Sequence, residues 1–404
     1  MIFWPLTAMH LRPQVMTTNF CMIVFSVYQQ EDYLNTGIIE YFSKIKDPRI
    51  LKKCEHKLID ILVIVVCATI CRFDESWESV EEFANEREDW FKKFLELPNG
   101  IPSHDTFRRV FLLLDPVGLN TCFIEWASSM REKIPNETIA VDGKTLAGSK
   151  DGEIRKKGVH VVSAWANHNN LILGQLKVDE KSNEITAIPK LLDLLDIKGC
   201  TVTIDAMGTQ KEIAKKIVAG EADYILGLKG NQGNLLDNVK TFIDDEIKTS
   251  VPGENFQKIE TTDADHGRIE IRKFYLFTQL DWLEQKTDWA ELNGIGAIDS
   301  VVEKNGKITK ERRYFITSLV DVVKFSNSSR AHWGIENSVH WILDVAFNED
   351  NSTRRKGNAP ENSAVLRHIV LNLLKKEKTR KISINRKRGM ACLRTDYLEK
   401  IIFG

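Results

Sequence analysis

Three short apolar segments decide the fold of this chain: TIAVDGKTL at residues 138–146, CTVTIDA at 200–206 and DYILGLK at 223–229. Each has the length of a strand and is rich in Val, Ile or Leu. Two segments of helical character, EITAIPKLLDLLDI at 184–197 and TQKEIAKKIVAGEA at 209–222, precede the second and third of these strands. Short strands that alternate with helices predict a sheet with helices packed on it.

A hairpin is expected between the first two strands. Residues 160–178, HVVSAWANHNNLILGQLKV, contain two β-rich runs around the turn-forming residues Asn167–Asn170. Another helix is expected at 234–248, NLLDNVKTFIDDEIK. The predicted order is β-β-β-α-β-α-β-α, which indicates an α/β fold with a mixed sheet flanked by helices.

The regions on either side of this sheet differ in character. Apolar runs such as KLIDILVIVVCATICRF at 57–73 predict helices on the amino-terminal side, and Asn305-Gly306 is a strong hairpin signal between later β-rich runs. The expected division is an apolar leader at 1–30, an all-α domain at 31–134, an α/β domain at 135–375 with a β-rich insertion at about 250–320, and a basic tail at 376–404.

Composition and charge give conflicting indications about the partner. The 404 residues are 43% hydrophobic and 28% charged, a globular composition that excludes a disordered or collagen-like chain. A net charge of −1 argues at first sight against a general polyanion binder. Yet residues 354–388 hold 12 basic and two acidic side chains. Such a cluster favours salt-sensitive DNA binding, with a solvated helix and tail as the alternative.

Cysteine usage and the leader bear on the compartment. The seven cysteines are odd in number and form no CxxC pair, so neither a zinc ribbon nor a disulfide framework is expected. Residues 1–30 lack the basic start and small-residue cleavage site of a signal peptide, and their uncharged run is too short to span a membrane. We interpret the chain as a cytoplasmic protein. Residues 1–30 are either an unstructured leader or the result of a start codon assigned too early.

Asp142 and Asp205 are the first candidates for chemistry, because each ends a short hydrophobic strand. Carboxylates at the rim of a sheet can hold a divalent hard cation such as Mg²⁺, which takes oxygen ligands. The glycines Gly143 and Gly208 permit a close approach of a ligand or backbone. The alternative is that each aspartate only caps the turn that follows it.

A polar row on one late helix is the second candidate. His332, Glu336, His340 and Asp344 recur every four residues, close to one helix face. A solvated face is the ordinary explanation of such a row. A zinc hydrolase is the chemical alternative, although no HExxH pattern occurs.

Long blocks of the sequence resemble one family. IAVDGKTLAGS at 139–149, VTIDAMGTQ at 202–210 and HWGIENSVHWILDVAF at 332–347 are similar to blocks of the H-repeat-associated class of bacterial insertion-sequence DDE transposases. The similarity runs from about residue 38 to residue 400. It implies a ribonuclease-H-like catalytic core, interrupted by a β-rich insertion before the catalytic helix and preceded by a helical associated domain.

The resemblance also implies the chemistry. It identifies Asp142, Asp205 and Glu336 as the catalytic triad, which would hold two Mg²⁺ ions, with Mn²⁺ as a substitute. The implied partners are double-stranded DNA at the element ends and the target, and a second copy of the chain when DNA is bound; no membrane is implied. The implied location is the bacterial cytoplasm, at the nucleoid when bound to DNA.

The resemblance and the basic cluster together supply the expected DNA contacts. These are Arg268, Arg330, His332, Arg354, Arg355, Lys356, Lys375, Lys376, Lys378, Arg380 and Lys381. Two positions depart from related proteins. Ala147 stands where an arginine is frequent, which would remove one phosphate contact. Leu343 stands where a second signature of related transposases requires a basic residue, so that signature is not expected here.

The function predicted from these residues is metal-dependent cleavage and transfer of DNA strands at the ends of an insertion sequence. Two alternatives remain open. The chain could be a ribonuclease-H-like endonuclease that does not transpose, or an inactive DNA-binding remnant. Trp165, Trp333 and Trp341 are expected in the core, with stacking on an extruded base as the alternative.

Overall fold

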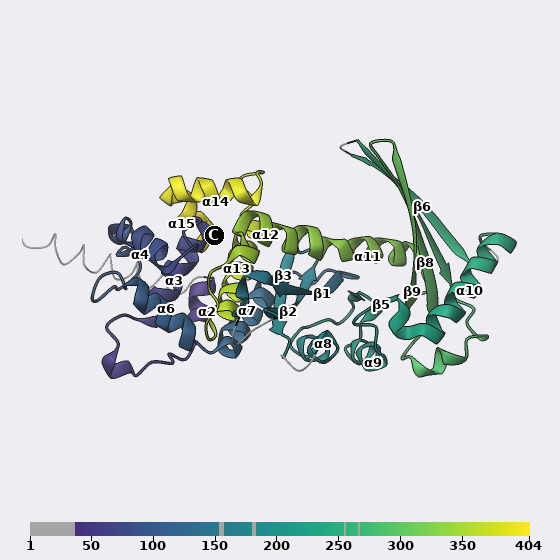
Figure 1. Ribbon diagram of the computed structural model, residues 1–404, viewed down its shortest axis with the longest axis horizontal. Helices are drawn as coiled ribbons and strands as arrows, with labels where there is room; N and C mark the ends of the chain where they lie inside the picture. The colour runs from purple at the N-terminus through teal and green to yellow at the C-terminus, as the bar shows by residue number, and fades with distance from the viewer. Residues whose placement is uncertain (1–36, 153–156, 180–182, 254–255, 266) are drawn as a thin grey trace, which may run out of the picture.

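The computed structural model describes residues 37–152, 157–179, 183–253, 256–265 and 267–404. The leader expected at 1–30 lies outside these residues. The molecule is elongated, with a helical body at one end, a sheet in the middle and a long β arm at the other end (Figure 1).

One nine-stranded sheet runs through the molecule in the order β3-β2-β1-β4-β5-β9-β8-β7-β6. β1, β4 and β5 are parallel to one another, and every other neighbouring pair is antiparallel. The predicted mixed α/β sheet is therefore confirmed. The strands are β1 (Thr138–Leu146), β2 (Val159–Ala166), β3 (Leu171–Lys177), β4 (Thr201–Ile204), β5 (Asp223–Leu228), β6 (Gln257–Asp265), β7 (Arg268–Phe277), β8 (Gly294–Lys304) and β9 (Lys307–Thr317).

Helices cover both faces of the central strands. Below the sheet in Figure 1 lie α8 (Glu184–Asp193) and α9 (Lys211–Ala219), whose apolar residues pack under β2, β3 and β5. Along the upper side runs α11 (Val322–Ile335), which continues as the π-helical segment η5 (Glu336–His340) and then as α12 (Trp341–Phe347). This continuous helix crosses β1 and β4, so it is the element that brings a third side chain over the strand ends.

The helical body combines segments from both ends of the chain. Its amino-terminal helices are α2 (Ile38–Phe42), α3 (Leu58–Ile70), α4 (Trp77–Asn85), α5 (Glu88–Phe91), α6 (His104–Leu113) and α7 (Pro116–Met130). The long buried helix α13 (Ala359–Lys376) joins this body to the sheet, because it packs on α3, α6, α7 and β3. Nearly every residue of α3 is buried, which explains its uninterrupted apolar sequence.

The carboxyl-terminal segment is not a tail. Residues after α13 fold into α14 (Ile384–Leu393) and α15 (Thr395–Phe403), which pack against α3 (Figure 1). The ring of Phe403 meets that of Phe94 at 5.2 Å, and the indole nitrogen of Trp90 donates to Glu399 at 2.6 Å. The many basic residues of this segment made it look like an exposed tail. Its apolar residues Leu398, Ile401 and Ile402 form a face that is buried in the structure.

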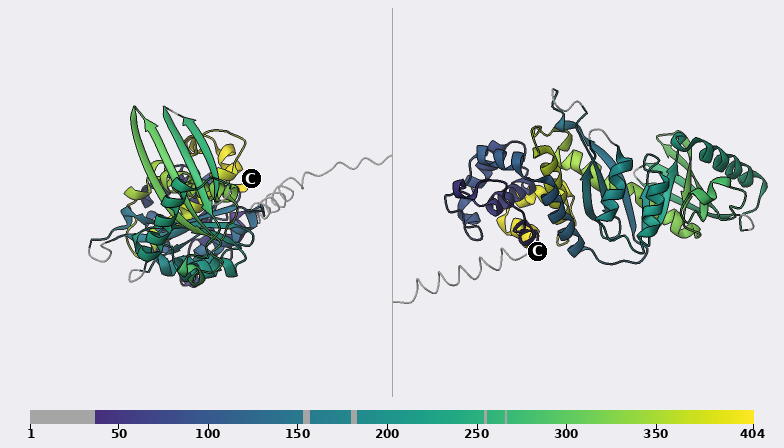
Figure 2. Two further views of the ribbon diagram at one scale, coloured as in Figure 1. Left: turned by 90° about the vertical axis from the view of Figure 1, so that its right-hand side faces the viewer. Right: turned by 90° about the horizontal axis from the view of Figure 1, so that it is seen from below.

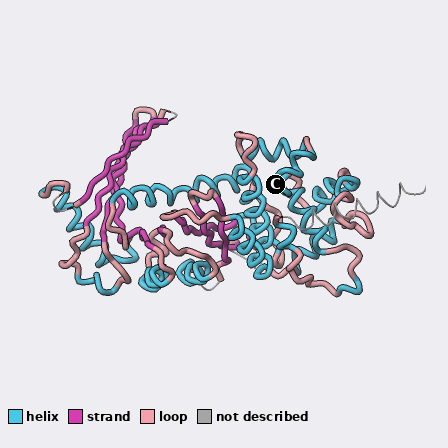
Figure 3. The backbone as a smooth tube through the Cα atoms, turned by 180° about the vertical axis from the view of Figure 1, so that it is seen from behind, coloured by secondary structure: helices cyan, strands magenta, loops and turns pink. Residues whose placement is uncertain are grey.

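The β-rich insertion extends the central sheet instead of forming a separate unit. β9 pairs with β5 from Ile225↔Thr317 to Leu228↔Tyr314, so backbone hydrogen bonds continue from the core into the arm. Beyond this point β6 to β9 twist away from the body as a long antiparallel ribbon (Figures 2 and 3). The helix α10 (Gly233–Thr249) leads into the arm and packs on β8 and β9.

No single helix in the described ranges is long and apolar enough to cross a membrane. The consecutive helices α6 and α7 reach that length and apolarity only when taken together, and they meet at an angle of 88°.

Candidate active site

The register of two parallel strands brings Asp142 and Asp205 together. β1 and β4 pair up to Val141↔Ile204, and each aspartate is the next residue of its strand. The two aspartates therefore lie on neighbouring strands at adjacent positions. Asp205 ends its strand as expected, whereas Asp142 does not, because β1 continues to Leu146. The alternative reading is also partly correct, because Oδ1 of Asp205 accepts the backbone N–H groups of Met207 at 3.0 Å and Gly208 at 3.3 Å.

The helix that begins as α11 follows β1 toward this edge. At the start of β1, the hydroxyl of Thr138 donates to the hydroxyl of Ser328, in the middle of α11, at 2.9 Å. One turn later, Nδ1 of His332 lies 3.0 Å from the hydroxyl of Thr203 on β4. These contacts fix the helix along the strand direction, so that each later turn lies nearer to the two aspartates.

The next turns reach the aspartates and pass beyond them. Nδ1 of His340 lies 3.5 Å from Oδ2 of Asp142. Beyond it, the ammonium of Lys144 on β1 pairs with Asp344 and, at 3.1 Å, with Glu349. The predicted row is therefore not a solvated face, because its histidines and Asp344 bond to the sheet. The histidines bond to different partners, which gives no support to a shared zinc ion.

Glu336 differs from the rest of this row, since its side chain is exposed. It is the first residue of the π-helical segment η5, where the helix is wider than an α-helix. Such segments are rare and frequently lie at functional sites. Glu336 lines a groove of about 510 Å³ together with three cations of the arm and one of α11, namely Arg268, Arg272, Arg313 and Arg330.

The electrostatics of Asp142 show which carboxylates share this site. Burial raises its pKa to about 6, and the negative charges of Asp205, Glu184 and Glu336 act in the same direction. The backbone N–H of Gly143 partly offsets this rise. Three other carboxylates thus oppose the ionisation of Asp142, and a bound cation would offset this effect.

The two histidines contribute no positive charge at neutral pH. Burial lowers the pKa of His340 to about 4, and the charge of Lys144 acts in the same direction. Burial also lowers the pKa of His332. Both imidazoles are therefore neutral hydrogen-bonding groups at pH 7, and the site keeps its negative charge.

Glu184 is a site residue that the sequence did not single out. It is the first residue of α8, and its Oε1 lies 2.7 Å from Nε2 of His160 on β2. The hydroxyl of Thr145 lies 2.8 Å from the other nitrogen of the same imidazole. An acidic residue in the first turn of a helix has an ordinary explanation in the helix dipole, so its sequence position carried no special signal.

The donor set suits a hard divalent cation. Carboxylate oxygens are the ligands that Mg²⁺ and Mn²⁺ take in proteins, and the site offers Asp142, Asp205 and Glu336 from three different elements. In the part of the chain that the structure describes, however, no group of three His, Cys, Asp or Glu side chains is arranged to hold a metal ion. The chemical nature of these residues suits such an ion, although their side chains are not gathered around one point in this structure.

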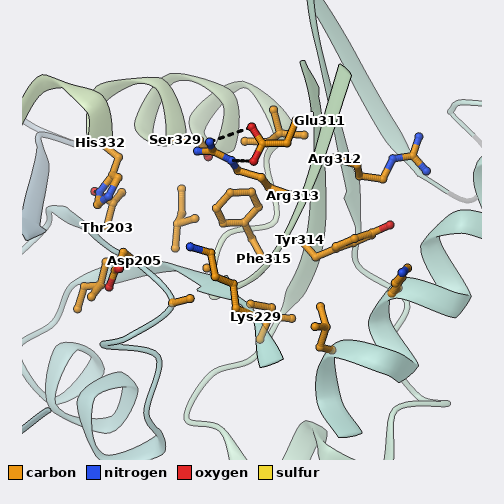
Figure 4. Close-up of a pocket in the computed structure, with 18 of the residues that line it drawn as sticks. Thr203, Asp205, Lys229, Glu311, Arg312, Arg313, Tyr314, Phe315, Ser329 and His332 are labelled. Carbon is orange, nitrogen blue, oxygen red and sulfur yellow. Dashed lines mark hydrogen bonds and ion pairs between the residues drawn. The ribbon is translucent and has the colours of Figure 1, made fainter. Parts of the chain in front are cut away.

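A cavity of about 610 Å³ opens beside Asp205, between the core and the base of the arm (Figure 4). Thr203, Asp205 and His332 line one side of it, and Lys229 points into it from the end of β5. On the opposite side, the guanidinium of Arg313 pairs with Glu311 at 2.8 Å.

The predicted DNA contacts near Glu336 lie on the arm and on α11. Arg268 is exposed at the start of β7 and pairs with Glu270 at 2.8 Å. Arg330 pairs with Asp263 of β6 at 2.7 Å. Both cations line the groove that contains Glu336, so the structure brings them next to the candidate triad. His332 does not line this groove, and its Nδ1 lies 3.0 Å from the hydroxyl of Thr203.

The position of Arg354 does not support a DNA contact. It is 6% exposed, its guanidinium lies 4.0 Å from the ring of Trp77, and it donates to the backbone oxygen of Asp74 at 3.1 Å. Other cations of the basic segment are buried as well, namely Arg367, Lys387 and Arg388. The charge count of residues 354–388 therefore overstates the positive charge at the surface.

The remaining predicted cations divide into two groups. Arg355 and Lys356 are exposed, and Nε of Arg355 donates to the backbone oxygen of Gly148 at 3.3 Å. Lys375 is half-buried over the ring of Trp165, and burial lowers its pKa to about 8. The exposed members that follow it are Lys376, Lys378, Arg380 and Lys381.

This second group lies far from the carboxylates. Lys375 donates to Asn170 at 2.9 Å, in the turn between β2 and β3. That turn adjoins the start of β1, since Ile139 pairs with Ala166, whereas Asp142 lies further along the strand. Lys375, at the end of α13, therefore lies near the amino-terminal end of β1, whereas Asp142 and Asp205 lie further along their strands in the carboxyl-terminal direction.

The tryptophans fall into three environments. Trp165 is 1% exposed and belongs to the core, as expected. Trp333 is half-buried between the guanidinium groups of Arg272 and Arg313, at 5.5 and 5.2 Å from its ring. Trp341 is 61% exposed, so the core expectation is wrong for it.

Comparison with known proteins identifies the family. Residues 133–373 match the model of the transposase DDE domain, and residues 39–127 match the model described as DDE_Tnp_1-associated. The chain belongs to the DDE transposase family. The family expected from the sequence blocks is therefore confirmed, and the DDE domain coincides with the sheet, the arm and the catalytic helix.

Its relatives agree with this membership. The "Putative transposase YncI" of Escherichia coli O157:H7 is 41% identical over 371 residues, which are 91% of this chain and 94% of the relative. The "H repeat-associated putative transposase YhhI" of Escherichia coli K12 is 38% identical over 91% of this chain and 98% of the relative. A cryo-EM structure of the piggyBac transposase synaptic complex with hairpin DNA covers 96% of this chain and 82% of its own, at 11% identity and a TM-score of 0.44.

Proposed function

We propose that this DDE transposase binds the ends of an insertion sequence and catalyses metal-dependent cleavage and transfer of DNA strands. The observation that supports the proposal is the placement of three carboxylates on two neighbouring strands and on the helix that crosses them. Asp142 and Asp205 follow the last paired residues of β1 and β4, and Glu336 lies where the helix over β1 widens. We infer that these three are the catalytic residues.

We also propose that the core is ribonuclease-H-like. The support is the strand order β3-β2-β1-β4-β5, in which an antiparallel β1-β2-β3 meander is followed by two parallel strands. The carboxylates lie at the carboxyl edge of the parallel strands, where open α/β sheets commonly bind ligands. The proposed domain order keeps the helical domain before this core and the β-rich insertion before the catalytic helix.

The proposed cofactor is Mg²⁺, two ions per site, with Mn²⁺ as a substitute. Bound there, the ions would supply activation of the attacking oxygen and stabilisation of the leaving oxygen. The chain holds the ligands in place. The N–H groups of Met207 and Gly208 fix one oxygen of Asp205, and neutral His340 lies 3.5 Å from Asp142 without neutralising it. The repulsion among the carboxylates disfavours the ion-free state of the site.

DNA is proposed to lie in the groove beside Glu336. Phosphate binding requires cations, and Arg268 and Arg330 stand on two walls of that groove. Exposed Arg355 and Lys356 and the cations of α13 and its following loop would hold further segments of the duplex. The reaction joins two element ends, so we propose a homodimer on DNA. The proposed location is the bacterial cytoplasm, at the nucleoid when bound.

A cleavage assay on a duplex that carries the element's terminal repeat tests this proposal. The substitution Asp205→Asn keeps an oxygen for the N–H groups of Met207 and Gly208, so the fold should survive while cleavage falls by at least about 10³-fold. The exposed Asp193→Asn on α8 is the matched control and should cleave as the unmodified chain does.

The outcomes distinguish the alternatives. Cutting at the ends followed by joining to a target supports a transposase, with Mg²⁺ or Mn²⁺ in the reaction. Cutting without joining supports an endonuclease, and binding without cutting supports an inactive remnant. Full activity of the Asp205→Asn variant would refute the proposed site.

A further inference from the structure

We propose that Glu184 is a fourth carboxylate of the catalytic site, held toward the bound divalent cation by His160, which acts as a positioning residue. This inference rests on the proposed function, since it assigns a further cation-binding group to the same site.

The close approach of Glu184 to the backbone beside Asp142 is the first observation. A Cβ atom at Gly143 would lie 2.2 Å from Oε1 of Glu184 and 2.8 Å from Nε2 of His160. Heavy atoms in proteins do not approach this closely, so the glycine leaves the space that the Glu184 carboxylate fills. Gly143 therefore leaves the space in which the Glu184 carboxylate lies against the backbone of β1, one residue after Asp142.

The second observation is that the Glu184 carboxylate is oriented. Its Oε1 is 2.7 Å from Nε2 of His160, and Nδ1 of that imidazole is 2.8 Å from the hydroxyl of Thr145. Thr145 and His160 are opposite each other on β1 and β2, so two strands fix the imidazole. Orientation of a ligand by a partner in the sheet is typical of groups that serve a metal ion.

The third observation is the charge balance. The side chain of Glu184 is only 16% exposed, and its ion-pair partner is His160, whose side chain is 29% exposed. Lys144, the cation two residues after Asp142 on β1, is already paired with Asp344 and Glu349. A fourth half-buried carboxylate adds negative charge to a site that already contains Asp142, Asp205 and Glu336. Such an addition is unfavourable for a residue that has only a structural role.

The alternative is that the contact between Glu184 and His160 only anchors the start of α8 to β2. In that case the pair stabilises the fold, and the site binds cations equally well without it. The two readings differ in the affinity for a cation, which is measured without DNA and without turnover.

The experiment uses the full-length chain and Mn²⁺ alone, with binding followed by electron paramagnetic resonance and by calorimetry. Glu184→Gln is expected to weaken Mn²⁺ binding about 10-fold or more. The matched control is Glu212→Gln, which removes the same charge from the first turn of the neighbouring helix α9, and its affinity should not change.

Gly143→Ala is the second variant, because it displaces the Glu184 carboxylate without altering its charge. It should weaken Mn²⁺ binding about as much as Glu184→Gln does. Circular dichroism and thermal unfolding establish that each variant is folded, and binding is compared only after that.

A double-mutant cycle tests the positioning role of His160. His160→Ala alone should weaken Mn²⁺ binding, and His160→Gln, which can still donate to Glu184, should restore part of the affinity. In the Glu184→Gln background, His160→Ala should have no further effect. A further loss of affinity in that background would show that His160 acts independently of Glu184, which contradicts the proposal.

The failures are distinguishable. If the unmodified chain binds Mn²⁺ and Glu184→Gln binds it equally well, the role of Glu184 is refuted and the proposed function stands. If the unmodified chain binds no Mn²⁺, with or without a terminal-repeat duplex, the metal-dependent function itself is refuted and this inference with it.

Discussion

Asp60 is an acidic residue in the first turn of the otherwise apolar helix α3. It is 1% exposed, and its carboxylate accepts the backbone N–H of Leu97 at 3.2 Å. Burial raises its pKa to about 6, well above its value in an unfolded chain. The folded state therefore favours the protonated form, and the ionised form is unfavourable inside the helix.

This shift predicts how Asp60 affects stability with pH. Because the folded pKa is raised, the contribution of Asp60 is fully favourable below about pH 4 and is lost as the pH rises through 6. Asp60→Asn keeps an acceptor for Leu97 but does not ionise. We expect it to raise the free energy of unfolding by up to about 3 kcal/mol at pH 8 and by about half as much at pH 5.

Urea unfolding at both pH values checks this expectation. Asp89→Asn on α5 is the control, because Asp89 is exposed and its neutralisation should change stability little at either pH. A gain for Asp60→Asn that is equal at pH 5 and pH 8 would contradict the assignment.

At this scale the sequence predicts some site residues and misses others for physical reasons. Asp142 and Asp205 were found because each interrupts an apolar strand, and this placement is local. Glu184 was missed because its role depends on Gly143 and His160, which the fold brings to it from other elements. The burial of Arg354 was missed because only tertiary packing decides which cations of a basic segment reach the surface.

The helix over β1 is the element that assembles the site, and Gly334 sets how closely it packs. A Cβ atom at Gly334 would lie 2.6 Å from the side-chain oxygen of Asn167 and 3.1 Å from the indole nitrogen of Trp165. The helix approaches β2 this closely only two residues before Glu336. Its position over the sheet thus depends on a residue without a side chain.

Gly334→Ala should therefore push the helix away from the sheet. We expect a loss of about 1–3 kcal/mol in the free energy of unfolding, with a parallel loss of DNA cleavage. The control is Gly233→Ala in α10, whose added Cβ meets no atom within 4 Å and which should be neutral or slightly stabilising. Equal stability of the two variants in urea would contradict this account.

The sequence predicts this helix but not its π-helical segment. Apolar and polar residues recur at helical spacing through 322–347, so the element itself follows from periodicity. The π-helical turn at Glu336–His340 cannot be predicted from residues that recur every four positions. It lies where His340 contacts Asp142 of β1 at 3.5 Å, a contact between residues far apart in the sequence. The order of strands and helices along the central part of the chain is predicted correctly. The pairing of β9 with β5 is a long-range contact that no local signal indicates.

Across the whole molecule, buried cations join the helical body to the catalytic domain. Arg388 of α14 is 2% exposed and donates to the backbone oxygen of Thr69 at 2.7 Å, at the end of α3. It also donates to the backbone oxygen of Ala346 in α12 and pairs with Asp74 at 3.3 Å. One guanidinium therefore connects the amino-terminal domain, the carboxyl-terminal helices and the catalytic helix.

Removal of this guanidinium should destabilise the molecule as a unit. Arg388→Met removes the donor to the backbone carbonyls of Thr69 and Ala346 and leaves Asp74 paired with Arg367 alone, at 3.6 Å. We expect a loss of about 3–5 kcal/mol in unfolding free energy. Arg386→Met on the same helix is the control, since Arg386 is exposed. A loss below about 1 kcal/mol for Arg388→Met would mean that the domains do not depend on this contact.

The surface cations give a prediction for DNA binding. Lys376, Lys378 and Lys381 are exposed beyond the end of α13. If each contacts a phosphate, the triple alanine variant should lower the slope of log affinity against log salt by up to about 2.7. Fluorescence anisotropy with a terminal-repeat duplex at several salt concentrations measures this slope.

A matched triple variant completes the comparison. Lys190, Lys198 and Lys215 are exposed on and near the helices below the sheet, and their replacement by alanine removes the same charge. Its salt slope should equal that of the unmodified chain. Equal slopes for both triple variants would show that the lysines after α13 do not bind the duplex.

The pairing of β9 with β5 has a consequence for truncated copies of this chain. Without residues 251–320, β5 would present a bare edge that includes the buried residues Tyr224, Ile225 and Leu226. Open apolar edges of this kind recruit strands from other molecules and initiate aggregation. A copy that loses its arm is therefore expected to precipitate, so that a deletion in this region removes the protein from the cell along with its activity.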